Sequence, residues 1–389
     1  MSESTHEIPV VDLNDLTSPQ SDVRAEAAAA VRRAFGHYGL IYIRNHGVDI
    51  DLLEKFYDAF LEFTSRSEDD KQKMSTPDIW YQRGWTPPNT EKAVVAGGQP
   101  DFKECFFITP YEPADELKQQ YPEIYASNIW PENADEFEGS YTELSRQLQQ
   151  VGVNLLRGCA LALGLAPQQF EAAVDGGPHV TRALRYIPLD DEQVDTDILW
   201  GEEHTDFNFL TILPGGRFLD PSGERCSKPD PDAGLYLRTR PNEEHPNGKL
   251  VQGQTPEGCI VAQVGQQLEI VTGGEFIATP HVIEAPKQPG YSRVAMAHFV
   301  HLHAHEQLFP LEPFRTDESV RAYGPPKMVG TYNLKTLIDI GLAPKEAFDR
   351  LGYTQYERLD KIRQEEKGGQ EEMGGQEEKG GQEAGEPAE

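Results

Sequence analysis

The sequence lacks the features of three broad classes of protein. No apolar run in its 389 residues approaches the length that crosses a bilayer. The opening MSESTHEIPVVDL has no basic stretch followed by an apolar one, so we expect no secretory signal and a cytoplasmic protein. Basic residues are not in excess either. The net charge is −30, whereas binding to a nucleic-acid backbone requires clustered Lys and Arg. We therefore expect neither nucleic acid nor membrane among its partners.

Cysteine is scarce, and its spacing argues against two kinds of site. The four cysteines are far apart and form no C-x-x-C pair, which argues against a zinc ribbon or a thioredoxin-type site. We expect reduced structural thiols. Cys105 stands beside Phe106 and Phe107 and is expected in the core rather than as a nucleophile.

The N-terminal half is expected to mix helices with short strands. Residues 75–100 are rich in Pro and Gly and predict a long loop, a type of segment that is often functional. Helix formers with apolar residues at helical spacing, and β-branched runs, predict the remaining elements. These are a strand at 8–13, a helix at 21–38 with Ser21 as its N-cap, a strand at 39–48, a helix at 49–65 and a long helix at 134–164.

Short β-rich runs separated by Gly and Pro dominate residues 176–302. Seven or more strands at such spacing predict a sandwich or a barrel, and the jelly roll is one type of this class. The runs are TRALRYIPL, FNFLTIL, GLYLRTR, CIVAQV, QLEIVTG, EFIATPHVI and RVAMAHFV.

The C-terminal part changes character twice. Residues 335–363 return to helical composition, and the tail then repeats a hexad three times, as EEKGGQ, EEMGGQ and EEKGGQ. Six residues rich in Gly and Glu cannot bury a core. We expect a disordered, acidic tail at 364–389 that takes no part in the chemistry.

The segment GEEHTDFNFLTIL, residues 201–213, places His204 and Asp206 two residues apart in an expected strand. Residues i and i+2 of a strand face the same side, so both side chains would project together. A metal ion satisfies two such groups at once. The pair alone arises about once by chance in a chain of this length, and the alternative is a polar strand edge with a hydrogen-bonded histidine.

Two further residues strengthen the metal interpretation. QLEIVTGGEFIATPHVIEAP reads as a hairpin that turns at Gly273-Gly274, with His281 near the end of its second run. Two histidines and one carboxylate form the facial triad of non-haem iron; zinc, which usually has four ligands, is the rival metal. Arg293 follows on a strand, where an inward guanidinium requires an anion, and a carboxylate suits it best.

In this order, HTD, TGGEFIATPHV and R-x-A resemble the Fe(II)/2-oxoglutarate-dependent dioxygenases of the isopenicillin N synthase-like superfamily. IPVVDL and FGHYGLIYIRNHGV resemble the start of its N-terminal domain, and RGW and PDFKECFFI also match, so the similarity spans residues 8–310. Within the superfamily, AGGQPDFKE, GLYLRTRP, TGG-x5-PH and Ala295 resemble bacterial ethylene-forming-enzyme-like members.

The resemblance implies a fold and a set of ligands. The fold class would be α+β with a mainly β core, a double-stranded β-helix or jelly roll, with helices in the N-terminal region and at the C-terminus. His204, Asp206 and His281 would bind Fe(II), and Arg293 would bind the distal carboxylate of 2-oxoglutarate. With O2, the co-substrate would become succinate and CO2 while a small molecule undergoes hydroxylation, desaturation or ring formation. Asp206 argues against halogenation, since halogenating relatives carry a small residue there.

The sequence also departs from the superfamily pattern. Plant-type relatives carry N-x-Y-x-P before the H-x-D, with its tyrosine on the co-substrate; here the stretch is LRYIPL, in which Tyr186 can serve. R-x-S is R-V-A here, so one hydroxyl donor is missing. Asn208 is expected to face inward toward the co-substrate. Arg182 is a candidate for an acidic substrate group or for a salt bridge, and Trp85 and Glu91 are candidates for the pocket wall.

The histidine-rich run AHFVHLHAH, residues 297–305, offers a second possibility. If the strand continues that far, His301, His303 and His305 share one face. Rim histidines at a solvated strand end are expected, and a second metal site is the alternative.

Two other functions stay open on the sequence alone. One is an isopenicillin N synthase-type oxidase that uses Fe(II) without 2-oxoglutarate; the other is a non-catalytic jelly-roll protein that binds a metal or small ligand. We expect a monomer or weak homo-oligomer. The expected parts are an N-terminal region at 1–130, a long helix at 131–175, the catalytic jelly roll at 176–310, a helical cover at 311–363 and the tail at 364–389.

Overall fold

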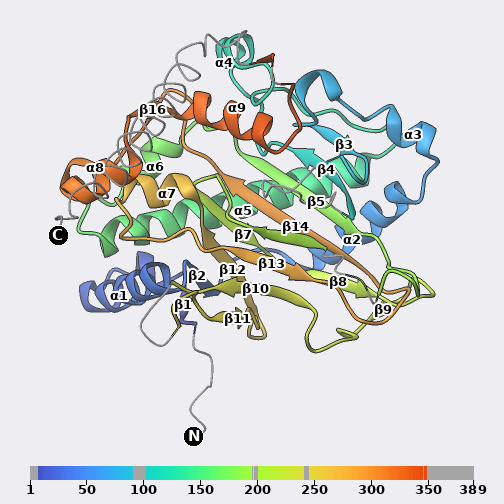
Figure 1. Cartoon of the computed structure of the whole chain (residues 1–389), viewed down its shortest axis with the longest axis horizontal. Helices are drawn as coiled ribbons and strands as arrows, with labels where there is room; N and C mark the ends of the chain where they lie inside the picture. Colours follow the sequence, from blue (N-terminus) through green and yellow to red (C-terminus); the bar gives the residue numbers. More distant parts are fainter. Residues whose placement is uncertain are drawn as a thin grey trace, which may run out of the picture. The chain divides into compact units, whose positions relative to one another are not determined.

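Figure 1 shows a computed structural model of the chain, whose residues separate into two compact units, 1–342 and 343–389. The structure describes residues 8–90, 102–194, 196, 200–240, 245–344, 346 and 347. Of the second unit, only residues 343, 344, 346 and 347 are described. Glu91 and the acidic tail lie outside the described residues.

The helices expected in the N-terminal half are present. The side chain of Asp49 accepts a 2.9 Å hydrogen bond from the Leu52 amide and so caps the second long helix. The expected cap at Ser21 is wrong, because Ser21 is the first helical residue and Gln20 precedes it without a side-chain cap bond. The helices are α1 (Ser21–His37), α2 (Ile50–Thr64), α3 (Glu68–Gln72), α4 (Asp115–Gln120), α5 (Asp135–Ala162), α6 (Gln169–Val174), α7 (Gln266–Val271), α8 (Asp317–Tyr323) and α9 (Val329–Asp339).

Two sheets form the β core. The larger runs in the order β1-β2-β12-β7-β14-β5-β4-β3, with β8 paired to β14 and β9 paired to β8, and the smaller runs β11-β10-β13-β6. The larger comprises β1 (Val10–Asp12), β2 (Leu40–Arg44), β3 (Gly84–Thr86), β4 (Lys103–Ile108), β5 (Val180–Tyr186), β7 (Leu210–Leu213), β8 (Gly216–Leu219), β9 (Arg225–Cys226), β12 (Cys259–Val264) and β14 (Ser292–Val300). The smaller comprises β6 (Gly201–His204), β10 (Gly234–Arg238), β11 (Leu250–Gln252) and β13 (His281–Glu284). Only a two-stranded ribbon, β15 (Gln307–Leu308) with β16 (Lys327–Met328), completes the pairings among the described residues.

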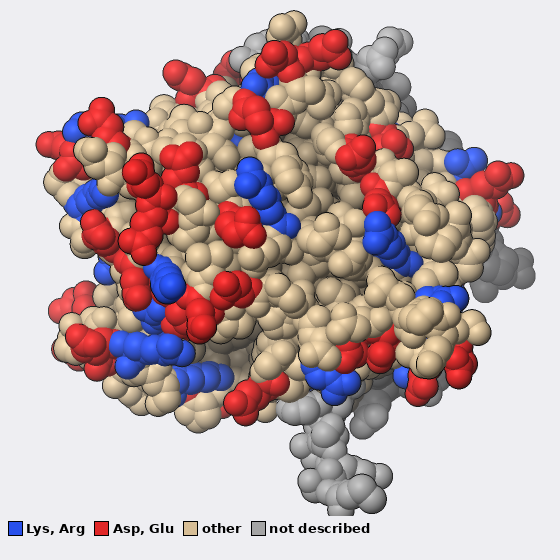
Figure 2. Space-filling model, turned by 180° about the vertical axis from the view of Figure 1, so that it is seen from behind, with Lys and Arg blue, Asp and Glu red and all other residues tan. Residues whose placement is uncertain are grey.

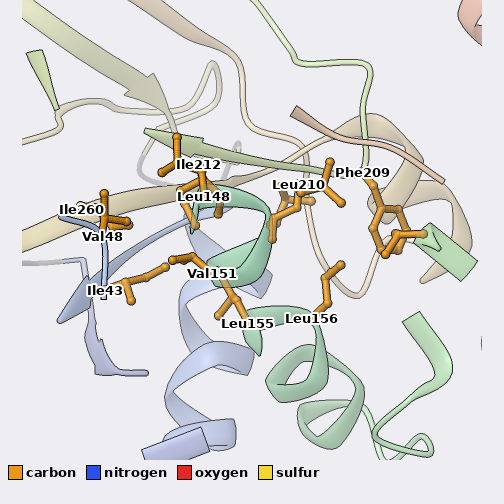
Figure 3. Close-up of a cluster of buried hydrophobic side chains, with 14 of the residues drawn as sticks. Ile43, Val48, Leu148, Val151, Leu155, Leu156, Phe209, Leu210, Ile212 and Ile260 are labelled. Atoms are coloured by element: carbon orange, nitrogen blue, oxygen red, sulfur yellow. The ribbon is translucent and has the colours of Figure 1, made fainter. Parts of the chain in front are cut away.

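The two faces of the larger sheet have different partners. On the inner face Cys105, Leu184 and Ala295 pack with Trp200, and Ile283 of the smaller sheet contacts this cluster. On the outer face Leu148, Val151 and Leu155 recur at helical spacing along α5 and pack on the sheet, as Figure 3 shows. This arrangement of a helical layer, a large sheet and a facing small sheet confirms the expected sandwich and is that of a jelly roll.

One expected strand is a helix. QLEIVTG was expected to be the first arm of a hairpin, but residues 266–271 form α7 and the second arm is limited to β13. Leu268 and Val271 are buried one helical turn apart, and Gly265 provides an extended N-cap. The run is apolar enough for either structure, and its tertiary contacts select the helix.

The strand through the histidine-rich run is shorter than expected. β14 ends at Val300, so His301, His303 and His305 are not strand neighbours. The Nδ1 of His298 lies 2.8 Å from the hydroxyl of Thr181 on β5, and its Nε2 lies 2.8 Å from the amide oxygen of Gln149 on α5. That amide also bonds His179, 3.1 Å away. The histidines of this run thus belong to separate environments.

Buried neutral histidines should make the stability pH-dependent. Burial lowers the pKa of His179 to about 3 and that of His301 to about 3, and it lowers the pKa of His298 well below its usual value. The unfolded chain takes up these protons near pH 6.5 and the folded chain does not, so the free energy of unfolding falls as pH drops through that range. We expect His298→Gln to reduce the slope of the unfolding free energy against pH by about 1.4 kcal/mol per pH unit near pH 5.5, because one buried neutral histidine is gone.

Urea unfolding at pH 7.5, 6.5 and 5.5 measures this slope. His37 is exposed, so His37→Gln is the matched control and should keep the wild-type slope. Equal slopes for His298→Gln and wild type would contradict a neutral His298.

Candidate functional site

Three potential metal ligands converge between the strands of the smaller sheet. His204 ends β6 and His281 begins β13, and the two residues are directly paired across these strands. Asp206 Oδ1 lies 3.6 Å from His204 Nε2 and 3.8 Å from His281 Nε2. One ligand atom from each of the three residues falls within 4.8 Å of the others. Two imidazole nitrogens and one carboxylate oxygen are the donor set of the facial triad.

Asp206 reaches this position by a different route from the one expected. β6 stops at His204, so strand alternation does not place the carboxylate. Instead, the turn after β6 is held by the N-terminus of α7. The Gln266 amide donates to the Asp206 carbonyl at 2.7 Å, and the Gln267 amide donates to the Asn208 carbonyl at 3.0 Å. The free amides of a helix start thereby fix the turn that carries the carboxylate.

Each ligand side chain has its outer polar atom bonded. His204 Nδ1 donates to the Glu202 carbonyl at 2.6 Å, and His281 Nδ1 donates to the Thr279 carbonyl at 3.2 Å. In the neutral imidazole these bonds place the proton on Nδ1 and leave the Nε2 lone pair free for a metal. Asp206 Oδ2 accepts from the Thr211 hydroxyl at 2.6 Å, which leaves Oδ1 toward the histidines. The residues present therefore fit a divalent metal ion.

The charges of the three groups are mutually dependent. Burial lowers the pKa of His281 to about 4, so its imidazole is neutral at pH 7. Burial acts in the same direction on His204, but the carboxylate of Asp206 outweighs it and raises the pKa of His204. For Asp206, burial alone would raise the pKa, yet the two histidines and Thr211 hold it well below the usual value. The site is an anionic centre that favours a cation.

Arg293 lies in an aromatic box on β14. Its direct neighbours across the sheet are Tyr186 on β5 and Phe218 on β8. The guanidinium carbon lies 5.7 Å and 5.6 Å from the centroids of these two rings. Its Nε is buried and has no hydrogen-bond partner in the described part of the chain. A buried guanidinium N–H that lacks a hydrogen-bond acceptor is suited to bind an anionic ligand.

Gly216 makes room for that guanidinium. A Cβ at this position would lie 2.9 Å from Arg293 Nε and 2.9 Å from its terminal nitrogen, and 2.7 Å from the Val294 carbonyl oxygen. No motif in the sequence marks Gly216. Its role follows from the pairing of β8 with β14, which places it opposite Ala295 on the strand that carries Arg293.

Two more cations face the inner side of the larger sheet. The Arg182 guanidinium lies 5.6 Å from the Phe107 ring and 5.2 Å from the Phe299 ring, and its charge contributes to lowering the pKa of His281. Lys103 is buried on β4, and its charge acts to lower the pKa of His204. Sequence reasoning missed Lys103, although strand alternation puts it on the same side as Cys105.

The remaining candidates have different environments. Tyr186 lies under Arg293 and stacks on Trp200, with ring centroids 5.1 Å apart. The Asn208 amide bonds the Thr211 hydroxyl rather than pointing into open space. Trp85 lies on the outer face of the larger sheet, packed in the core with Phe106, and its indole donates to Glu104 at 2.9 Å. The structure thus brings Tyr186 to the side of Arg293 and does not bring Trp85 to the metal ligands.

Within the described ranges, the triad is the only cluster of three or more His, Cys, Asp or Glu whose ligand atoms are close enough for one ion. His303 and His305 have ring centroids 5.1 Å apart, but no third ligand of this kind joins them there. The described residues include no helix long and apolar enough to span a membrane.

Comparison with known proteins agrees with this geometry. Residues 8–133 match the family described as non-haem dioxygenase in morphine synthesis, N-terminal. A homoarginine-6-hydroxylase of Arabidopsis thaliana is 26% identical over 328 residues, which cover 80% of this chain and 90% of the plant protein. A 2OG-Fe(II) oxygenase family protein of Caulobacter crescentus has a TM-score of 0.69 at 22% identity, covering 86% of this chain and 100% of that one.

A Neurospora crassa protein solved with alpha-KG and thymine has a TM-score of 0.68 at 22% identity, covering 87% of this chain and 98% of that one. The N-terminal third of the chain thus matches a non-haem dioxygenase family, and the chain shares its fold with a 2OG-Fe(II) oxygenase family protein. These relatives favour an enzyme that uses 2-oxoglutarate over the two alternatives left by the sequence, an oxidase without 2-oxoglutarate and a non-catalytic binding protein.

Metal binding to this site should stabilise the fold. A ligand that binds only the folded chain raises the free energy of unfolding by about 2.7 kcal/mol when its free concentration is 100 times its Kd. We expect Mn(II), which does not oxidise in air as Fe(II) does, to raise the melting temperature of metal-free protein. Asp206→Ala should abolish the increase, and the exposed control Asp190→Asn should keep it. An unchanged increase in Asp206→Ala, measured by thermal unfolding, would place the ion elsewhere.

Proposed function

We propose that His204, Asp206 and His281 bind the Fe(II) of this dioxygenase, on the observation that their ligand atoms lie within 4.8 Å of one another. The two paired strands and the turn docked on α7 hold the ligands before the ion arrives, which limits the loss of side-chain freedom on binding. When bound, the ion supplies the O2 chemistry that couples decarboxylation of 2-oxoglutarate to substrate oxidation.

We further propose that Arg293 binds the distal carboxylate of 2-oxoglutarate. The guanidinium presents planar, charge-assisted donors, and its aromatic box excludes water that would weaken the bond. Tyr186 holds that guanidinium by ring contact, a different role from the direct contact expected at first. The Asn208 amide, which was expected to face the co-substrate, bonds the Thr211 hydroxyl.

Arg182 is our candidate for substrate recognition. Its charge acts on His281, so it lies near the metal ligands, and two phenylalanine rings flank it. This combination favours a small substrate with an acidic or hydrogen-bond-accepting group next to an apolar part. Glu91 stays a candidate for the pocket wall. The homoarginine-6-hydroxylase relative makes amino-acid substrates the first class to screen.

Surface charge, free thiols and surface hydrophobicity bear on partners, location and oligomeric state. Figure 2 shows acidic and basic side chains interspersed on one face, without a continuous basic area, which supports a protein that binds no nucleic acid. The four cysteines are free, in agreement with a reducing, cytoplasmic location. Exposed large apolar side chains are scattered, which supports a monomer or weak homo-oligomer. We place the catalytic core at 176–310.

Succinate formation tests the proposed ligands. Purified protein with Fe(II), ascorbate, O2 and 2-oxoglutarate should release succinate slowly without substrate and faster with the right amino acid or small natural-product scaffold. His204→Ala should lose this activity because one imidazole ligand is missing. Full activity in His204→Ala would reject the metal assignment, whatever the substrate.

The packing at Gly216 yields a separate test of Arg293. Gly216→Ala should displace the guanidinium and raise the KM for 2-oxoglutarate about 10-fold, the size of effect that loss of one charged hydrogen bond produces. The kcat at saturating 2-oxoglutarate should change little. Gly139→Ala is the matched control, because a Cβ there meets nothing within 4 Å. If Gly216→Ala has the same KM for 2-oxoglutarate as wild type, the proposed contact between Arg293 and the co-substrate is contradicted.

A further inference from the structure

Asp206 is held by a short chain of buried side chains on its own segment. The Thr211 hydroxyl lies 2.6 Å from Asp206 Oδ2, 3.1 Å from Asn208 Nδ2 and 3.2 Å from Asn208 Oδ1. Thr211 and Asn208 are each 1% exposed. Neither side chain therefore has bulk water as an alternative partner, and their hydrogen bonds must be made with each other and with the carboxylate.

The direction of these hydrogen bonds follows from counting protons. A hydroxyl has one proton, and an ionised carboxylate can only accept. The contact to Oδ2 is the shorter of the two that Thr211 could donate, and it is charge-assisted. The Thr211 proton therefore goes to Asp206, and the Asn208 amide donates to the lone pair of the Thr211 oxygen. The chain runs from Asn208 through Thr211 to Asp206 Oδ2.

We propose that Thr211, supported by Asn208, is a positioning residue that fixes which carboxylate oxygen of Asp206 faces the metal. The inference rests on the proposed function, since it takes Asp206 as a ligand. With Oδ2 occupied by the hydroxyl, only Oδ1 turns toward the Nε2 atoms of His204 and His281. Asp206 then contributes one oxygen, and the remaining positions stay available for the co-substrate and O2.

The backbone makes this arrangement rigid. The Gln266 amide holds the Asp206 carbonyl at 2.7 Å, the Gly265 amide holds the Phe209 carbonyl at 3.1 Å, and Thr211 itself pairs with Gln263 and Phe299 on its two flanking strands. A hydroxyl fixed in this way keeps its direction when the ion is absent. The same chain replaces the expected role of Asn208 as a contact of the co-substrate.

Co(II) binding to metal-free protein tests the proposal without turnover. Thr211→Val keeps the side-chain shape and removes the donor, so we expect the Kd for Co(II) to rise about 10-fold or more, as outer partners of metal ligands typically cause. The visible spectrum of bound Co(II), which reports its coordination number, should also change, because the released Oδ2 can join the ion. Thr211→Ser should restore both values to within about twofold of wild type.

Two further variants make the test specific. Thr272 is a fully buried threonine whose hydroxyl bonds the Leu268 carbonyl at 2.8 Å, away from the triad, so Thr272→Val is the matched control and should bind Co(II) as wild type does. Asn208→Leu should weaken Co(II) binding without any 2-oxoglutarate present. If Asn208 contacted the co-substrate instead, Asn208→Leu would weaken 2-oxoglutarate binding and leave Co(II) binding unchanged.

The outcomes are distinct. If Thr211→Val keeps its melting temperature and binds Co(II) like wild type with the same spectrum, the proposal is overturned. Failure of Thr211→Ser to restore binding would overturn it as well. If wild type itself binds Co(II) no better than Asp206→Ala, the proposed metal site fails, and that result is separate from the role of Thr211.

Discussion

The site depends on the close packing of one carboxylate, Asp206, with two imidazoles, His204 and His281. A buried carboxylate requires positive charge or hydrogen bonds, whereas buried imidazoles prefer to be neutral. Asp206 keeps its charge with help from Thr211 and from the two histidines, while His281 is neutral near pH 7. A divalent cation can bind all three groups at once. Their other polar atoms, the Nδ1 of each histidine and Oδ2 of Asp206, already have hydrogen-bond partners.

The two arginines of the inner face have separate aromatic surroundings. Arg293 sits in a box of Tyr186 and Phe218, beside a glycine that leaves space for its guanidinium. Arg182 lies between two phenylalanines and acts electrostatically on His281. A dianionic co-substrate at the first cation and a small substrate at the second would both approach the same metal ligands. The apolar walls strengthen each charge interaction by excluding water.

Much of the site could be predicted from the sequence because strand alternation and residue chemistry are local. Such patterns predict a sandwich or barrel and single out the triad residues and the strand-borne Arg293, and the resemblance to the superfamily implies the jelly roll and the roles of these residues. The position of Asp206 does not, since it lies past the end of β6 and depends on amides of α7, a segment that was expected to be a strand. Trp85 was assigned to the pocket, yet it packs on the outer face of the larger sheet. The sequence analysis overlooked Lys103 although strand alternation places it on the inner face, whereas the bond of Thr211 to Asp206 depends on the folded turn.

The central claim is that His204, Asp206 and His281 together hold the iron. Anomalous X-ray scattering at the iron edge, from crystals loaded anaerobically with Fe(II), locates the ion directly. The account predicts one strong peak within bonding distance of His204 Nε2, His281 Nε2 and Asp206 Oδ1. A peak at another place, such as the His303 and His305 pair, or no peak in protein shown to be folded and loaded, would contradict it.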